Sequence, residues 1–273
     1  MDFSIQRISE HITRVIAFNT EMMYLVQGGN KAALIDTGSG FGSLRACIAE
    51  LTDLPVIVLL THGHTDHAMG TAEFDTVYMN HADDAVFAVH GGKEFRLSSL
   101  DLSSHTAEIA KLPYIETDDC NRFLQLNAGD CFDLGDIHID IFGCKGHTAG
   151  SLCMLIREER ALLLGDACNG LTFLFDEFST GVREYRDSLV KLKIETDGKY
   201  DVILLSHTGG EPRTDMIESN IAVCGDILSG NTDDQPFEFK GMKLKLAKAF
   251  SFGQGRLDGG SGNIVYSDDT KSR

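Results

Sequence analysis

The sequence predicts an α/β (α+β) protein in which β-sheets pack face to face with helices on the outside. Each half of the chain has short strands first, then a strand that ends in a polar loop, and then a helix. This order favours packed sheets over one doubly wound parallel sheet. The 273 residues are 42% hydrophobic, enough for a substantial core, and no linker rich in proline or serine separates the halves. We therefore predict a single domain over residues 1–273.

The first part of the chain predicts three strands. Residues 11–19, 22–29 and 31–40 are β-like runs that glycine-rich turns separate. Residues 41–53 follow with apolar residues at helical spacing. This pattern predicts antiparallel strands followed by a helix.

A buried strand and a polar loop come next. Residues 55–63 are too apolar to alternate, as expected of a strand that is covered on both faces. A short helix is predicted at 66–73 and another strand at 75–80. The loop between strand and helix therefore lies at the end of a buried strand.

Residues 82–127 are the least strand-like part of this half. They contain helical stretches at 83–92 and 103–112, so we predict a helical insertion or lid. At the other end of the chain, residues 236–273 contain β-like segments rich in glycine and lysine. We predict a β-rich tail there.

The second half contains two hairpins and two helices. Residues 131–144 and 151–167 each read as two strands joined by a tight turn. Helices are predicted at 183–195 and 213–228, with a strand at 200–207 between them. The strand, loop and helix order of the first half is thereby repeated.

Charge and composition narrow the possible partners. The formal net charge of −17 repels polyanions, which disfavours nucleic acid and anionic membrane surfaces. No apolar run approaches the roughly 20 residues of a membrane helix. The seven cysteines are odd in number and form no C-x-x-C pair, as expected of reduced thiols in the cytoplasm. We expect a cytoplasmic protein with a small-molecule substrate; the sequence does not indicate its oligomeric state.

The loop "THGHTDH" after the apolar strand gathers four side chains that can bind metals. His62 and His64 are two residues apart, so in an extended loop both point to the same side and can bind one ion. Asp66 and His67 lie where the loop enters a helix, and adjacent side chains diverge there. The spacing indicates two neighbouring ions.

Three more candidate ligands follow predicted strands. His147 lies in "GCKGHTAGS", Asp166 in "LLLGDA" and His207 in "LLSHTGG". The predicted first ion has the ligands His62, His64 and His147. The predicted second ion has the ligands Asp66, His67 and His207. Asp166 is predicted to bridge the two ions.

These motifs resemble the metallo-β-lactamase-fold superfamily. H-x-H-x-D-H after an apolar strand, then G-H-T-x-G-S, G-D and S-H, match in order and spacing over roughly residues 12–210. The resemblance implies a four-layer αββα sandwich with the metals at one edge of the sheets, and it assigns the same ligands. It is closest to the glyoxalase II-like and lactonase-like hydrolases. It also implies that Asp36 supports the histidine loop from behind.

The predicted cofactors are two Zn²⁺ ions, and the same ligands also suit Fe or Mn. A hydroxide held between the ions would attack an acyl carbonyl, so a thioester or lactone is the expected substrate. The resemblance makes Asp66 both a ligand and the carrier of a proton to the leaving group. Cys168 and Asn169 follow Asp166 closely enough to contact substrate, or to serve only in packing. Phenylalanines in 168–184 could form an apolar wall, although core packing explains them almost as well.

Other functions remain open at this point. A mononuclear-iron persulfide dioxygenase-like oxidoreductase shares the first motif, and a phosphodiesterase shares the ligands. The net charge of −17 disfavours polymeric phosphodiesters. A non-catalytic binding scaffold would be expected to have lost ligands, and all seven are present.

Overall fold

The chain forms two compact units, which are described separately. The computed structural model describes residues 3–17, 20–100, 106–109, 111–207 and 213–273. Unit 1 consists of Met1–Asp140 and Ile156–Glu159, and unit 2 consists of Ile141–Leu155 and Arg160–Arg273. The prediction of one domain over 1–273 remains a prediction.

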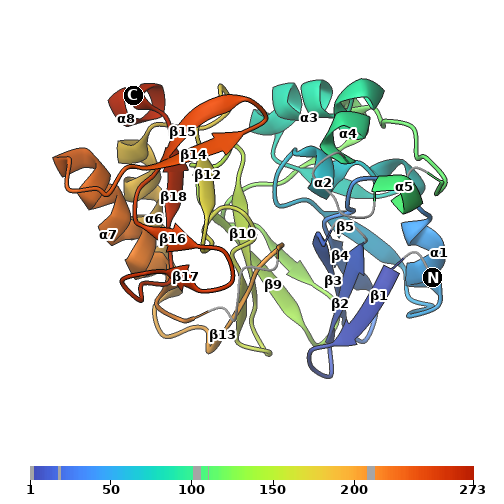
Figure 1. Cartoon of the computed structure of the whole chain (residues 1–273). Coiled ribbons are helices and arrows are strands. Elements are labelled where there is room, and N and C mark those ends of the chain that lie inside the picture. The colour runs from blue at the N-terminus through green and yellow to red at the C-terminus, as the bar shows by residue number, and fades with distance from the viewer. Residues whose placement is uncertain (1–2, 18–19, 101–105, 110, 208–212) are drawn as a thin grey trace. The chain divides into compact units, whose positions relative to one another are not determined.

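Unit 1 is built on a seven-stranded sheet in the order β1-β2-β3-β4-β5-β6-β7, of which Figure 1 labels β1 to β5. Its strands are β1 (Phe3–Arg7), β2 (Ile12–Ala17), β3 (Met22–Gln27), β4 (Ala32–Ile35), β5 (Val56–Leu59), β6 (Val77–Met79) and β7 (Leu124–Gln125). Its helices are α1 (Leu44–Ala49), α2 (Thr65–Ala68), η1 (Thr71–Glu73), η2 (His81–Asp83), α3 (Asp84–His90), α4 (Lys93–Leu100), α5 (Thr106–Ile109) and η3 (Cys120–Arg122).

This sheet is antiparallel at one side and parallel at the other. β1 to β4 pair antiparallel through short turns, whereas β4 to β7 pair parallel through helical connections. Ile35 pairs with Leu59, so the carboxyl ends of β4 and β5 lie at the same edge. The loops that carry Asp36 and His62 therefore begin side by side.

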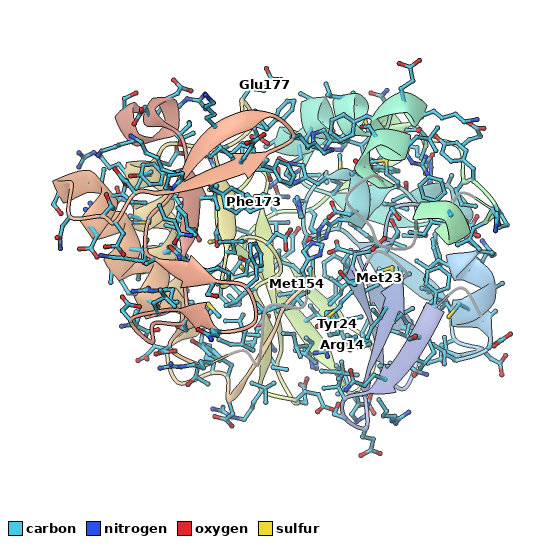
Figure 2. All side chains as sticks on the ribbon, in the orientation of Figure 1. Arg14, Met23, Tyr24, Met154, Phe173 and Glu177 are labelled. Atoms are coloured by element: carbon cyan, nitrogen blue, oxygen red, sulfur yellow. The ribbon has the colours of Figure 1, made fainter. Side chains whose placement is uncertain are left out.

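Packing and cross-strand contacts stabilise this sheet. Leu25, Leu34 and Val58 are buried with Ile48 of α1 and Phe87 of α3 in one apolar cluster. Burying such a side chain stabilises the fold by roughly 1.5–3 kcal/mol. Figure 2 labels the cross-strand pair Arg14 and Tyr24; the Nε of the arginine donates to the tyrosine hydroxyl at 3.1 Å.

Unit 2 contains the remaining strands and helices. The boundary between the two units falls within β9 (His138–Gly143). β8 (Cys131–Asp133) pairs antiparallel with the first half of β9, and both belong to unit 1. The remaining elements are β10 (Leu152–Ile156), β11 (Ala161–Leu163), β12 (Thr172–Leu174), α6 (Val182–Thr196), β13 (Val202–Leu204), α7 (Met216–Ser229), β14 (Gln235–Phe239), β15 (Met242–Leu246), β16 (Phe250–Ser251), β17 (Gly255–Arg256), β18 (Ile264–Tyr266) and α8 (Asp268–Ser272).

These strands form two larger sheets and a hairpin. The first sheet continues β9 in the order β13-β11-β10-β9, and the second has the order β12-β18-β15-β14. β16 and β17 pair with each other. Helices α6 and α7 lie side by side (Figure 1) and bury Tyr185, Leu189, Val223 and Ile227 in the core of unit 2.

Most predicted elements are present, and most strands are shorter than predicted, whereas α6 extends one residue further at each end. The helix predicted at 66–73 is split into α2 and η1, and three strands, β1, β7 and β12, were not predicted. β1 is an edge strand whose last four residues are all exposed, so it lacks the apolar alternation that reveals a strand. The segment 82–127 contains α3, α4 and α5, and part of the helical stretch 103–112 lies outside the described residues. Its role as a lid remains a prediction.

The cysteines and the lengths of the helices are two further features of the described residues. All seven cysteines lie in the described ranges and are free thiols. Among the described residues, no helix combines the length and the apolar stretch that crossing a bilayer requires.

Gly146, next to His147, is required by close packing. A Cβ placed there would lie 2.1 Å from Cδ2 of the Tyr185 ring, which is fully buried in α6. We expect Gly146→Ala to lower the free energy of unfolding by about 1–3 kcal/mol in urea denaturation. Gly225→Ala is the control: it lies in α7 with open space around it, and should raise stability by roughly 0.5–1 kcal/mol. Equal stability of the two variants would contradict this account.

Candidate metal centre

The loop after β5 gathers three imidazole rings in unit 1. His62 and His64 lie in this loop, and His67 lies in α2. The ring centroid of His62 is 4.7 Å from that of His64 and 4.1 Å from that of His67. All three side chains are buried. Buried imidazoles this close to one another are an arrangement typical of metal ligands.

A carboxylate behind this loop orients two of the rings. Asp36 follows β4 and accepts from Thr61 N at 2.7 Å and from the Thr61 hydroxyl at 2.8 Å. Its Oδ2 also lies 2.8 Å from His67 Nδ1. Because the Thr61 hydroxyl donates to Asp36, its oxygen accepts from His62 Nδ1, 3.0 Å away. Nε2 is then the nitrogen that can bind a metal in both rings.

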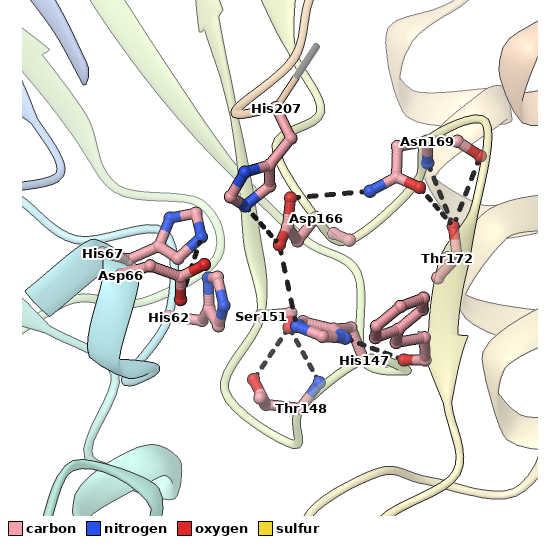
Figure 3. A network of polar contacts seen from close by, with 12 residues as sticks. His62, Asp66, His67, His147, Thr148, Ser151, Asp166, Asn169, Thr172 and His207 are labelled. Carbon is pink, nitrogen blue, oxygen red and sulfur yellow. Dashed lines mark hydrogen bonds and ion pairs between the residues drawn. The ribbon is translucent and has the colours of Figure 1, made fainter. Parts of the chain in front are cut away.

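Asp66 lies beside the ring of His67. Its Oδ1 is 3.7 Å from His67 Nε2, and 28% of its side chain is exposed (Figure 3). A carboxylate at this position can face an ion and still exchange a proton with solvent. This geometry is compatible with both roles predicted for Asp66.

Two residues of the helical segment 82–127 also contact the histidine loop, and the sequence did not identify either. Asp83 is fully buried and accepts from Gly63 N at 3.0 Å. The ring of His90 stacks on His64, with centroids 4.6 Å apart, and on Phe95 at 4.2 Å. The only sequence signal was their position after a predicted strand. The segment therefore supports the loop that carries His62 and His64.

In unit 2, a backbone carbonyl orients His147. His147 Nδ1 donates to the carbonyl oxygen of Phe173, in β12, at 2.7 Å (Figure 3). The Ser179 hydroxyl donates to the carbonyl of His147 at 3.0 Å. The ring is buried, and its Nε2 lies 4.0 Å from Asp166 Oδ2. Nε2 is therefore the nitrogen of His147 that can bind a metal.

Asp166 and His207 meet because their strands are parallel neighbours. β11 precedes Asp166 and β13 precedes His207, and Leu163 pairs with Leu204. His207 Nε2 lies 3.2 Å from Asp166 Oδ2. The same carboxylate oxygen therefore faces the Nε2 atoms of two histidines, His147 and His207 (Figure 3).

The two residues predicted to contact substrate, Cys168 and Asn169, face different parts of unit 2. Asn169 Nδ2 lies 3.5 Å from Asp166 Oδ1, so this amide can orient the carboxylate. Cys168 is fully buried, and its thiol faces α7, 3.8 Å from the carbonyl of Met216. Burial raises the pKa of the Cys168 thiol well above its ordinary value, which keeps it neutral. This position favours packing over substrate contact for Cys168.

The donor set fits a borderline transition-metal ion. Groups of histidine and aspartate that could hold a metal ion are present, and their donors are ring nitrogens and carboxylate oxygens. Hydrogen bonds to Thr61, Asp36 and the Phe173 carbonyl fix Nδ1 of three of these rings. Such outer hydrogen bonds are typical of metal-binding histidines. Zn²⁺, Fe and Mn are all compatible with these donors.

Comparison with known proteins identifies the family. The family model described as "Metallo-beta-lactamase superfamily" matches residues 19–207. The chain therefore belongs to the metallo-beta-lactamase superfamily, and the predicted resemblance is confirmed. The acyl-coenzyme A thioesterase MBLAC2 of Bos taurus is 27% identical over 164 residues, which cover 54% of this chain and 58% of that protein. The match thus spans just over half the length of that relative.

Solved structures confirm the predicted metallo-β-lactamase fold. A metallo-beta-lactamase from Pontibacter korlensis matches with a TM-score of 0.57 and 16% identity, over 82% of this chain and 99% of that one. The sec-alkylsulfatase Pisa1 from a Pseudomonas species matches with a TM-score of 0.63 and 10% identity, over 84% of this chain and 42% of that one. At these identities the likeness concerns the fold alone.

Proposed function

We propose that this protein is a metal-dependent hydrolase that cleaves an ester-type bond, with a thioester as the first choice. The observation that carries the proposal is Oδ2 of Asp166, which faces the Nε2 atoms of His147 and His207. A carboxylate oxygen shared between ligands in this way suits two neighbouring ions. Membership of the superfamily supports the same reading.

The proposed centre uses all seven candidate ligands. His62, His64 and His147 would hold one ion, and Asp66, His67 and His207 would hold the other. Asp166 would contact both ions. The order of the motifs along the chain and the family match over 19–207 support this assignment. When bound, such ions polarise a carbonyl and lower the pKa of water toward neutrality.

The residues of the chain have separate tasks in this proposal. Asp36 and Thr61 fix Nδ1 of His67 and His62, so Nε2 of each ring would be the atom that binds an ion. Asp66 is partly exposed, so it can pass a proton to the leaving group and regain one from solvent. Asn169 steadies Asp166 through its amide.

The thioester is favoured among ester-type substrates because the MBLAC2 relative is named an acyl-coenzyme A thioesterase. A lactone is the next choice, since it presents the same kind of carbonyl. A persulfide dioxygenase-like oxidation and a small phosphodiester are the competing activities. Two zinc ions per chain support the hydrolase, whereas one iron with oxygen consumption would overturn it.

An Asp66→Asn variant tests the proton transfer. We expect it to lose about 10²–10⁴-fold in kcat on thioesters, because the amide cannot carry the proton. The measurement is kcat and KM on a panel of thioesters, lactones and phosphodiesters, with metal content from elemental analysis. Asp75→Asn is the control, because the Asp75 side chain is 95% exposed. This variant should keep the wild-type kcat, KM and metal content. Full turnover and full metal content in Asp66→Asn would exclude the proposed role.

A further inference from the structure

The four-stranded sheet of unit 2 has apolar side chains on both faces. On one face, Leu174 of β12 and Ile264 and Tyr266 of β18 are fully buried in the core of unit 2. The other face has a second apolar cluster. We call it the phenylalanine face, and define it as Phe173, Phe175, Phe237 and Phe239 above Leu246 and Val265.

Strand alternation places these rings on one side of the sheet. Phe173 lies between Thr172 and Leu174, which are both fully buried and point to the opposite face. Phe237 and Phe239 alternate with exposed residues along β14. In the floor of the face, Leu246 pairs with Val265 across β15 and β18.

The rings contact one another and remain partly exposed. The centroid of Phe173 is 5.1 Å from that of Phe239 and 5.9 Å from that of Phe237, and Phe175 is 5.7 Å from Phe239. Leu246 and Val265 beneath them are 1% and 0% exposed, so solvent does not reach the floor of the face. Contiguous apolar surface that retains solvent exposure is typical of a binding site for apolar ligands.

The phenylalanine face is continuous with the metal ligands of unit 2. The carbonyl of Phe173 accepts the hydrogen bond from His147 Nδ1 at 2.7 Å (Figure 3), while its side chain contacts Phe237 and Phe239. One residue thus orients a metal ligand and begins the apolar surface. A substrate whose carbonyl lies beside His147 would meet this surface with the group attached to that carbonyl.

We propose that the phenylalanine face binds the acyl chain of the substrate, and this proposal rests on the ester-type hydrolysis proposed above. The cluster consists of aromatic and aliphatic side chains, so it matches an alkyl chain rather than a charged or sugar-like group. Phe237 and Phe239 lie outside the residues 19–207 that the family model matches. The half of the face on β14 therefore comes from the tail, whereas Phe173 and Phe175 come from the part that the family model matches.

The expected result is a strong dependence of kcat/KM on chain length. Hydrolysis is measured with acetyl, butyryl, octanoyl and dodecanoyl thioesters of coenzyme A. Each methylene that reaches the phenylalanine face should raise kcat/KM by up to about fourfold. A flat series from acetyl to dodecanoyl would overturn the proposal.

Variants on one strand separate the two faces of the sheet. Phe239→Ala should lower kcat/KM at least about tenfold for dodecanoyl thioester and leave the acetyl thioester unchanged. Phe237→Ala provides a second variant with the same expectation. Glu238→Ala is the matched control, because it lies between them on the same strand and is exposed on the other side. Equal losses for acetyl and dodecanoyl substrates would contradict a chain-binding role.

A binding measurement keeps this proposal separate from the proposed function. Dodecanoate binding to the full chain is measured by calorimetry, together with the oligomeric state by light scattering. Binding that Phe239→Ala abolishes and Glu238→Ala preserves supports the site, even when no thioester is cleaved, in which case only the proposed function fails. Absence of dodecanoate binding would refute the acyl site. It would also be refuted if Phe239→Ala dissociates a dimer but leaves the dependence of kcat/KM on acyl-chain length unchanged.

Discussion

An Asp166→Asn variant is expected to lose at least about 100-fold in thioester hydrolysis and to bind fewer metal ions per chain. Removing an outer partner of a metal ligand already costs 10–100-fold, and Asp166 is proposed as a ligand itself. Its Oδ2 lies 3.2 Å from His207 Nε2 and 4.0 Å from His147 Nε2. An amide keeps the shape of the side chain but lacks the charge that holds two cations together. Metal content by elemental analysis and kcat/KM are the measurements.

The control for this prediction is Asp187→Asn in α6. That carboxylate is 65% exposed and pairs with the neighbouring Arg186 at the surface, an interaction worth about 0–1 kcal/mol. We expect it to keep wild-type activity and metal content. Asp166→Asn should also keep its circular dichroism spectrum, since the change is isosteric. Two ions per chain and normal turnover in Asp166→Asn would refute the bridging role.

An Asp36→Asn variant is expected to lose about 10–100-fold in metal affinity or activity. The amide oxygen can still accept from Thr61 N, but an amide NH₂ in place of Oδ2 cannot accept from His67 Nδ1. His67 would then lose the contact that fixes its orientation. Asp36 has a φ of 63°, a left-handed conformation that asparagine tolerates, so the backbone should keep its path.

Competition with a chelator measures this affinity, and thermal denaturation measures stability in parallel. Asp136→Asn is a suitable control, because Asp136 accepts from Gly29 N at 2.7 Å in an exposed turn. It should leave metal affinity unchanged. A lower melting temperature in Asp36→Asn with wild-type metal affinity would assign Asp36 a purely structural role.

The secondary structure was largely predictable where local patterns are strong. The strand β3, buried along almost its whole length, and the 15-residue helix α6 both fall within two residues of their predicted bounds. β1 and β12 were not predicted, for different reasons. β1 is an exposed edge strand, and β12 is only three residues long and follows the loop after Asp166. Too few residues alternate in either strand to produce a clear pattern.

The candidate ligands could be named from the sequence because their signals are local. His62, His64, Asp66 and His67 lie within six positions, and the remaining ligands each follow an apolar strand. The family model matches residues 19–207, a range that contains all seven candidate ligands. Sequence alone thus determined the family, the fold and the residues proposed to bind metal.

Only the tertiary structure revealed the groups that hold and surround those ligands. Asp83 contacts Gly63 across 20 residues, and the Phe173 carbonyl contacts His147 across 26. The phenylalanine face joins Phe173 to Phe239, which lies in a different strand near the end of the chain. Such contacts depend on strand register and loop conformation, and the free energy that selects them comes from packing of the whole unit rather than from local sequence.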